Sequence, residues 1–287
     1  MKKNLYIIAA LLLSVGSIMA QPQSAGAPRL FIKAGHNLMA PVWSPDGSSL
    51  AVTGDNYTGI WVAKADGSDL SQLTDEAGAG YKMLWTSDSK SIIARTDQLV
   101  ENRRFHEVKS IDVATRNVKT IVGRTRSLTG TPTLKNITAK TVTTNAYEIM
   151  MNNPVKATEM IAGLADYAGK MVINPALSPN GVKVAFQIPG KGAFVCDVNG
   201  NNVRSIGQGS YASWLPDSRY VVVSRIKDDG NIFTSAELYA IDTNNGEATV
   251  LESDSKLIPI THAVSPDGKK VAFENSADGN IYIMDLK

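Results

Sequence analysis

A short apolar segment recurs six times along the chain, and its spacing constrains the fold more than any other feature. From one copy to the next, the last residue of the segment advances by 39 to 48 residues. The copies occupy residues 60–64, 108–112, 147–151, 193–197, 238–242 and 281–285. A repeat of this length is typical of folds that build one supersecondary unit per copy. We therefore expect six units.

A second marker, the turn sequence Ser-Pro-Asp-Gly, runs in phase with the first. It is complete at 44–47 and 265–268, and it is altered at 86–89, 178–181 and 215–218. Proline presets the backbone of a turn, Asp or Asn bonds to its own backbone, and Gly accepts positive φ. Each copy lies between two β-rich runs, and the six-fold segment followed by a polar turn adds two more strands. Four antiparallel strands per repeat predict the blade of a β-propeller.

The sequence therefore predicts an all-β chain, a six-bladed β-propeller of four-stranded antiparallel blades. The expected blades cover residues 36–75, 76–123, 124–163, 164–207, 208–252 and 253–287. The last blade lacks its fourth strand, whereas 29–33 forms an extra β-rich segment before the first blade. We expect this N-terminal strand to close the ring, with Leu30 and Ile32 buried, because closure removes an exposed sheet edge.

Tryptophan repeats at one phase of the pattern, two residues before the turn proline or its substitute. The three copies are Trp43, Trp85 and Trp214. A large aromatic side chain at a fixed phase favours packing between neighbouring blades over a ligand platform. The single cysteine, Cys196, lies in an apolar strand and is interpreted as a small buried side chain.

The first twenty residues read as an export signal. Lys2 and Lys3 precede an apolar stretch from Tyr6 to Ile18, and Ala20 offers a small residue at the cut. The alternative is a membrane anchor, which the short apolar stretch and the polar residues after it disfavour. The expected organisation is a signal peptide at 1–20, a linker at 21–28 and the propeller at 29–287, in a periplasmic or secreted protein.

Without the signal peptide the chain carries as many basic as acidic residues. A balanced charge without a basic run argues against nucleic-acid binding and against an anionic membrane surface. We expect a monomer without cofactor that binds an envelope protein, a peptide or a glycan.

The phased Ser-Pro-Asp-Gly turn and the segment Ile281–Asp285 resemble the repeats of the TolB propeller family, also called WD40-like or PD40 repeats. The resemblance spans residues 29–287 and implies a six-bladed periplasmic propeller. The α/β domain that precedes the propeller in TolB has no counterpart here. Propellers of this kind serve as binding platforms, as lyases and as domains attached to peptidases, so the resemblance implies the fold rather than the activity.

Two connections between second and third strands exceed the others in length, and we expect them to form a binding rim. They are the loops Thr96–His106 and Lys227–Ala236, from blades that stand opposite each other in a ring of six. Arg and Tyr often anchor interfaces. The alternative is two solvated loops. The candidate binding residues on these loops and around the same rim are Tyr57, Arg103, Arg104, His106, Tyr211, Phe233 and His262.

An enzymatic alternative depends on histidine. Some propeller lyases within the wider resemblance use a histidine cluster and a divalent metal to cleave uronate sugars. His36 and His262 both precede inner strands and could approach each other as metal ligands. A metal site needs three or four converging ligands, and the chain contains three histidines in all. We therefore predict no catalytic residues and keep a metal-assisted polysaccharide lyase or hydrolase as the alternative.

Overall fold

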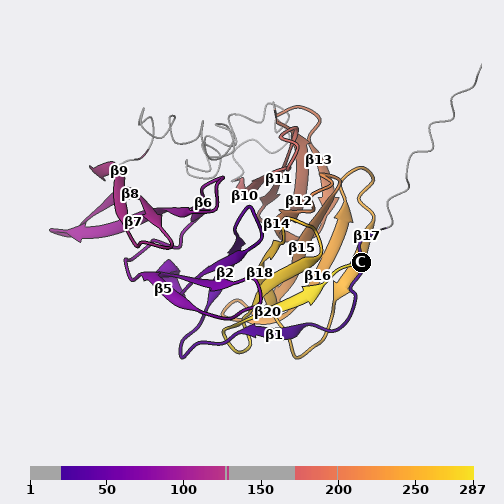
Figure 1. Ribbon diagram of the computed structural model, residues 1–287. Coiled ribbons are helices and arrows are strands. Elements are labelled where there is room, and N and C mark those ends of the chain that lie inside the picture. The colour runs from indigo at the N-terminus through magenta and orange to yellow at the C-terminus, as the bar shows by residue number, and fades with distance from the viewer. Residues whose placement is uncertain (1–20, 127, 129–171, 199) are drawn as a thin grey trace, which may run out of the picture.

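The computed structural model describes residues 21–126, 128, 172–198 and 200–287, which form five four-stranded antiparallel sheets (Figure 1). We number the blades by the six-fold sequence pattern, so blade three is the one expected at 124–163. Blade one contains β2 (Met39–Trp43), β3 (Ser49–Thr53), β4 (Ile60–Lys64) and β5 (Ser71–Thr74). Blade two contains β6 (Leu84–Trp85), β7 (Ser91–Val100), β8 (Arg103–Asp112) and β9 (Val118–Thr125).

The other three sheets follow the gap in the described residues. Blade four contains β10 (Ile173–Leu177), β11 (Lys183–Ile188), β12 (Gly192–Asp197) and β13 (Arg204–Gly207). Blade five contains β14 (Ser210–Trp214), β15 (Tyr220–Asp228), β16 (Phe233–Asp242) and β17 (Ala248–Glu252). Blade six contains β18 (Pro259–Val264), β19 (Lys270–Asn275), β20 (Asn280–Asp285) and, from the N-terminal side, β1 (Arg29–Ile32).

The propeller of four-stranded antiparallel blades is confirmed, and the blade count is not. The described residues form five blades rather than six. The expected third blade lies outside the described residues from 129 onward, as does the expected signal peptide at 1–20. The limit expected at about residue 123 lies close to the end of β9 at Thr125. Within the part of the chain that the structure describes, no helix is long and apolar enough to cross a membrane.

The tryptophans join neighbouring blades, as the repeated phase predicts. All three are buried. Each indole N–H donates a hydrogen bond to a backbone carbonyl on the first strand of the preceding blade: Trp43 to Ala263 at 3.2 Å, Trp85 to Val42 at 3.1 Å and Trp214 to Ala176 at 2.9 Å. The first strands of these blades therefore lie next to one another, and the outer strands point away from the axis.

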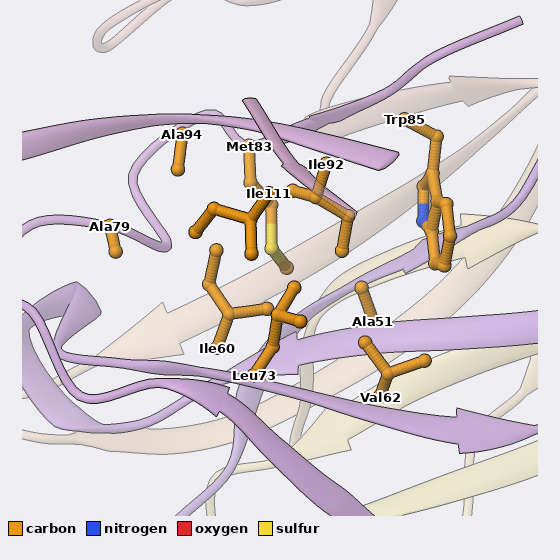
Figure 2. Packing of buried hydrophobic residues seen from close by; sticks show 10 residues of the cluster. All are labelled: Ala51, Ile60, Val62, Leu73, Ala79, Met83, Trp85, Ile92, Ala94 and Ile111. Atoms are coloured by element: carbon orange, nitrogen blue, oxygen red, sulfur yellow. The ribbon is translucent and has the colours of Figure 1, made fainter. Parts of the chain in front are cut away.

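Apolar clusters fill the spaces between neighbouring blades. Figure 2 shows the cluster between blades one and two, where Met83 and Trp85 pack against Ala51, Ile60 and other residues. Similar clusters join blades four and five, five and six, and six and one. Alternating side chains place one apolar row on each face of a sheet, so a blade needs a neighbour on both sides. The clusters therefore determine which blades are neighbours in the ring.

The expected hairpin turns form, and they also join blades. In the complete turn, Gly47 adopts φ +70° and Ser44 donates a hydrogen bond to Asp46 at 2.6 Å. Serine replaces this glycine in blades two and five, at Ser89 and Ser218, with φ of 59° and 56°. Each of these hydroxyls accepts a backbone N–H from the turn of the preceding blade, at 3.1 and 3.0 Å. In the altered copies, serine adopts positive φ less readily than glycine does, but its hydroxyl makes a hydrogen bond to the neighbouring blade.

The N-terminal strand closes the ring as expected. β1 pairs antiparallel with β20, and Figure 1 shows it beside that strand near the C-terminus. Ile32 is buried in the cluster between blades six and one. The expectation for Leu30 was wrong, since its side chain is 48% exposed. The bulge between Leu30 and Ile32 shifts the register, and this sends only one of the two side chains into the core.

Closure by β1 gives a stability prediction with a matched control in the same strand. Ile32→Ala removes a fully buried side chain, so we expect it to lower the free energy of unfolding by about 2–4 kcal/mol. Leu30→Ala removes an exposed side chain of the same size, and we expect a change below about 0.5 kcal/mol. Urea denaturation followed by tryptophan fluorescence measures both. Equal losses from the two variants would contradict the closure.

Candidate functional site

Two of the blades carry hairpins that extend beyond the others. The segments expected as long loops at 96–106 and 227–236 are mostly strand, since β7 and β8 pair from Ser91 to Asp112 and β15 and β16 pair from Tyr220 to Asp242. The loop assignment was therefore wrong. The polar side chains of both segments lie on the faces of regular hairpins, where alternation fixes which of them share a face.

Four described blades share an unusual backbone turn, which lies within the first strand in blades one, four and five and just before it in blade two. Three residues before the tryptophan position, the residue has positive φ, a conformation that side chains other than Gly and Asn adopt at a cost. The residues with this backbone are Ala40, Lys82, Asn174 and Tyr211, and Thr261 stands at the same position in blade six. The bulge breaks the register of the first strand in blades one, four, five and six.

On each second strand, the residue nearest the bulge is polar. In each blade, one residue of the second strand pairs with the tryptophan position of the first strand. The polar residue lies three residues after that partner. These residues are Thr53, Arg95, Gln187, Ser224 and Glu274. The blades therefore place a set of polar side chains at one level near the axis, and the chemistry differs from blade to blade.

Blades six and one meet at a buried carboxylate. Glu274 accepts hydrogen bonds from the Thr261 hydroxyl and, at 3.0 Å, from the backbone N–H of Ala40. Burial raises the pKa of Glu274, although both hydrogen bonds lower it, and Asp55 raises it further. Burial likewise raises the pKa values of Tyr57 and Tyr211, and Glu274 adds to both shifts. Tyr211 also raises the pKa of Tyr57.

A cleft of about 630 Å³ lies between the start of blade two and the loops of blade one. One wall carries Tyr57 and Tyr81, whose rings meet edge to face with centroids 5.1 Å apart. The guanidinium of Arg95 lies over the Tyr81 ring at 4.5 Å, and Arg104 lines the outer part. The cleft thus combines aromatic surface with two positive charges.

Asp97 holds the polar wall of this cleft together. It shares a face of β7 with Arg95, and it pairs across the hairpin with His106. Its carboxylate accepts from Arg95 Nη2 at 3.3 Å and lies 2.8 Å from His106 Nδ1. Gly78 makes room for it, because a Cβ there would come within 2.9 Å of the Asp97 carboxyl carbon. The cleft is therefore built to a fixed shape.

Six of the seven predicted binding residues divide into three groups, and the seventh, His262, is buried between blades five and six. Tyr57 and Arg104 line the cleft, and His106 contacts it through Asp97. Tyr211 lies in the axial cluster with Glu274. Arg103 and Phe233 are exposed on the two long hairpins. Sequence reasoning missed Tyr81 as a ring contact of Arg95, and it missed Lys82, Arg95 and Glu274. Lys82, Arg95 and Glu274 each lie at a fixed distance in the repeat from the tryptophan position, and this spacing could have identified them.

The placement of the two candidate metal histidines was wrong. His262 is buried between blades five and six, with Nε2 2.9 Å from the Val222 carbonyl and Nδ1 3.2 Å from the Ser224 hydroxyl. Burial lowers its pKa. His36 is exposed and packs against Trp61 with ring centroids 4.6 Å apart. His262 is therefore neither at a rim nor available as a ligand, and the two rings do not form a pair.

A second cleft, of about 510 Å³, lies between blades four and five. Arg225 stacks on Tyr239 at 3.7 Å and donates from Nε to the Gln208 carbonyl at 3.1 Å. The Tyr239 hydroxyl donates to Glu237 at 2.9 Å. Here one ring face is already covered by the guanidinium, and the cationic and acidic side chains balance.

The chemistry open to the first cleft is recognition by charge and aromatic contact. His106 and Asp97 form a pair, with His106 Nδ1 2.8 Å from a carboxylate oxygen of Asp97, that is able to orient an acid or base. Among the residues that the structure describes, no group of three or more His, Cys, Asp or Glu side chains could hold a metal ion. The cysteine is buried, and burial raises the pKa of its thiol to about 12.

The fold and the cleft define a β-propeller with a polar and aromatic cleft at the axial end of its blades. No protein-family model matches the chain, and no curated protein matches it. Solved structures with similar folds include TolB from Acinetobacter baumannii, at 13% identity and a TM-score of 0.38 over 88% of this chain and 55% of the TolB chain. The match therefore spans about half of TolB.

Two further propellers resemble the chain to a similar degree. An oligogalacturonate lyase from Vibrio parahaemolyticus is 13% identical with a TM-score of 0.49, over 88% of this chain and 79% of the lyase. The Cps50 (Swd1) β-propeller domain from Myceliophteria thermophila is 10% identical with a TM-score of 0.44, over 91% of this chain and all of the domain. Similarities this distant say nothing about what the chain binds.

The buried carboxylate of the axial cluster predicts a pH-dependent stability. Because burial raises the pKa of Glu274, the folded protein holds this proton more tightly than the unfolded chain does, and stability falls as pH rises above the ordinary Glu pKa. Glu274→Gln keeps an acceptor for Thr261 and Ala40 without a charge. We expect its melting temperature to exceed that of the native sequence at pH 8 and to match it near pH 4.

Thermal unfolding from pH 4 to pH 8 measures this difference. Glu237→Gln, at the partly exposed carboxylate of the second cleft, serves as the control. If the difference in melting temperature between Glu274→Gln and the native sequence stays constant with pH, burial does not shift the pKa of Glu274.

Proposed function

We propose that this chain is an exported, non-catalytic β-propeller that binds a partner in the cell envelope through the cleft between blades one and two. The observation that carries the proposal is a preformed cleft of about 630 Å³ in which Tyr57, Tyr81, Arg95 and Arg104 converge. Small-molecule and peptide sites are typically clefts of about 300–1,000 Å³ with a few oriented polar groups. Tyr and Arg are also the side chains that most often anchor binding.

The rigidity of this cleft supports binding. Arg95 is fixed by Tyr81 below it and by Asp97 beside it, and Asp97 is fixed in turn by His106 and by its own backbone bond to Ala77 at 2.8 Å. A side chain that is already oriented loses little conformational freedom when a ligand arrives. The partner is a protein, a peptide or a glycan of the envelope, which the export signal predicted at 1–20 would let the chain reach.

A six-bladed ring remains a prediction of the repeat spacing. It is supported by two apolar clusters, on blades two and four, to which no other described sheet contributes a buried residue. The proposed site does not depend on this count, since every residue of the cleft lies in blades one and two.

The test compares binding at the two clefts. Residues 21–287 are screened against a glycan array and a random peptide display library, and each ligand found is measured by calorimetry. We expect Arg104→Ala and Tyr57→Ala to weaken binding at least ten-fold, because both side chains face the ligand. Arg225→Ala removes the equivalent charge of the second cleft and should leave the dissociation constant within two-fold.

Ligands that respond only to Arg225→Ala would move the site to blades four and five and contradict the proposal. Conversion of a bound glycan into shorter products would contradict its non-catalytic part. Circular dichroism of each variant checks that a loss of affinity does not come from unfolding.

A further inference from the structure

Lys82 carries a positive charge into a half-buried place without a counter-charge. It stands in the turn just before the first strand of blade two, with φ 54°. Its Nζ lies 5.4 Å from the centre of the Tyr81 ring. No carboxylate of the described residues lies within ion-pair distance of the Lys82 ammonium, since none of the ion pairs of the described residues includes it. Burial lowers the pKa of Lys82, and Arg95 lowers it further.

Arg95 is only partly satisfied as well. Asp97 meets it from the side, with Nη2 at 3.3 Å from one carboxylate oxygen and Nε at 3.2 Å from the other. The second contact lacks hydrogen-bond geometry, so the buried Nε makes no hydrogen bond with the described residues. Asp97 also serves His106. The Asp97 carboxylate therefore pairs with both Arg95 and His106, and no carboxylate of the described residues pairs with Lys82.

Both cations lie on the ring of Tyr81, at 4.5 and 5.4 Å from its centre. A cation over an aromatic face is attracted by the electrons of the ring, which holds each group in place. Two like charges on one ring still repel each other, and the repulsion grows as water is excluded. Such an arrangement favours an anion that bridges the pair.

We propose that Lys82 and Arg95 together bind a carboxylate of the ligand beside the Tyr81 ring, at the edge of the cleft that Tyr81 and Arg95 line. This inference rests on the proposed binding function and names the chemistry of its ligand. A carboxylate offers two oxygens, one for the ammonium and one for the outer edge of the guanidinium. A phosphate dianion would bring a second negative charge close to Asp97, whose carboxylate also lines the cleft, and would be repelled more strongly than a carboxylate. The carboxylate can belong to an acidic peptide or to an acidic sugar.

The experiment uses small carboxylates as probes, so it needs no identified partner. Proton–carbon NMR follows the lysine ε-CH₂ and tyrosine ring signals of residues 21–287 during titration with N-acetylglutamate, glucuronate, phosphate and chloride at constant ionic strength. The Lys82 signal is assigned by its absence in Lys82→Gln. We expect saturable shifts at Lys82 and Tyr81 with the carboxylates, and weaker binding of phosphate. N-acetylglutamate and glucuronate separate the two sources.

Lys82→Gln should weaken the carboxylate at least five-fold when followed at Tyr81. Lys82→Arg keeps the charge and should stay within two-fold, and Lys119→Gln, on an exposed residue of β9, should change nothing. Carboxylates that cause no saturable shift, equal binding by Lys82→Gln, or tighter binding of phosphate would each overturn the inference.

The two proposals fail in different ways. A peptide or glycan that binds the cleft with equal affinity in Lys82→Gln would leave the binding function intact and remove the carboxylate site. Carboxylate binding at Lys82 together with screens that find no peptide or glycan ligand would support the site and contradict the binding function.

Discussion

Burial of both faces of each sheet is the constraint on which the rest of this structure depends. A four-stranded blade presents an apolar row on each side, and neither row can be covered by its own strands. The tryptophan between blades both fills this space and needs an acceptor for its N–H. Trp43, Trp85 and Trp214 find that acceptor on the first strand of the preceding blade, so packing and hydrogen bonding set the same distance between blades.

This distance also determines where polar groups can gather. The bulges before Trp43 and Trp214 turn the first strand where neighbouring blades come closest, and they cost backbone strain at Ala40 and Tyr211. In blades six and one the freed backbone N–H of Ala40 bonds to Thr261 and Glu274 across the interface. The bulge thus brings polar side chains of adjacent blades into contact without disturbing the apolar clusters outside them.

The sequence predicted the framework well because the framework repeats. Turn residues, apolar strands and tryptophans recur at fixed positions in the repeat, and each of these patterns independently predicts the same order of strands. It predicted the site poorly because the site does not repeat. Thr96–His106 read as a loop, since an exposed hairpin alternates polar side chains much as a loop does. His262 read as a rim residue because its partners, Val222 and Ser224, belong to another blade and are separated from it by some forty positions.

The residues that the sequence reading missed share a property that explains why they were missed. Lys82, Arg95 and Glu274 occupy repeat positions at which the other blades carry different residues, such as Asn174, Gln187 and Ser224. Repetition marks what every blade needs for folding, whereas variation at a fixed, strained position marks what only some blades need. Blade two carries two cations at these positions and blade six a carboxyl group, so the charge at the repeat positions differs from blade to blade. The ligand that we propose must match the charge of blade two, because the carboxyl group of blade six already accepts hydrogen bonds from Thr261 and Ala40.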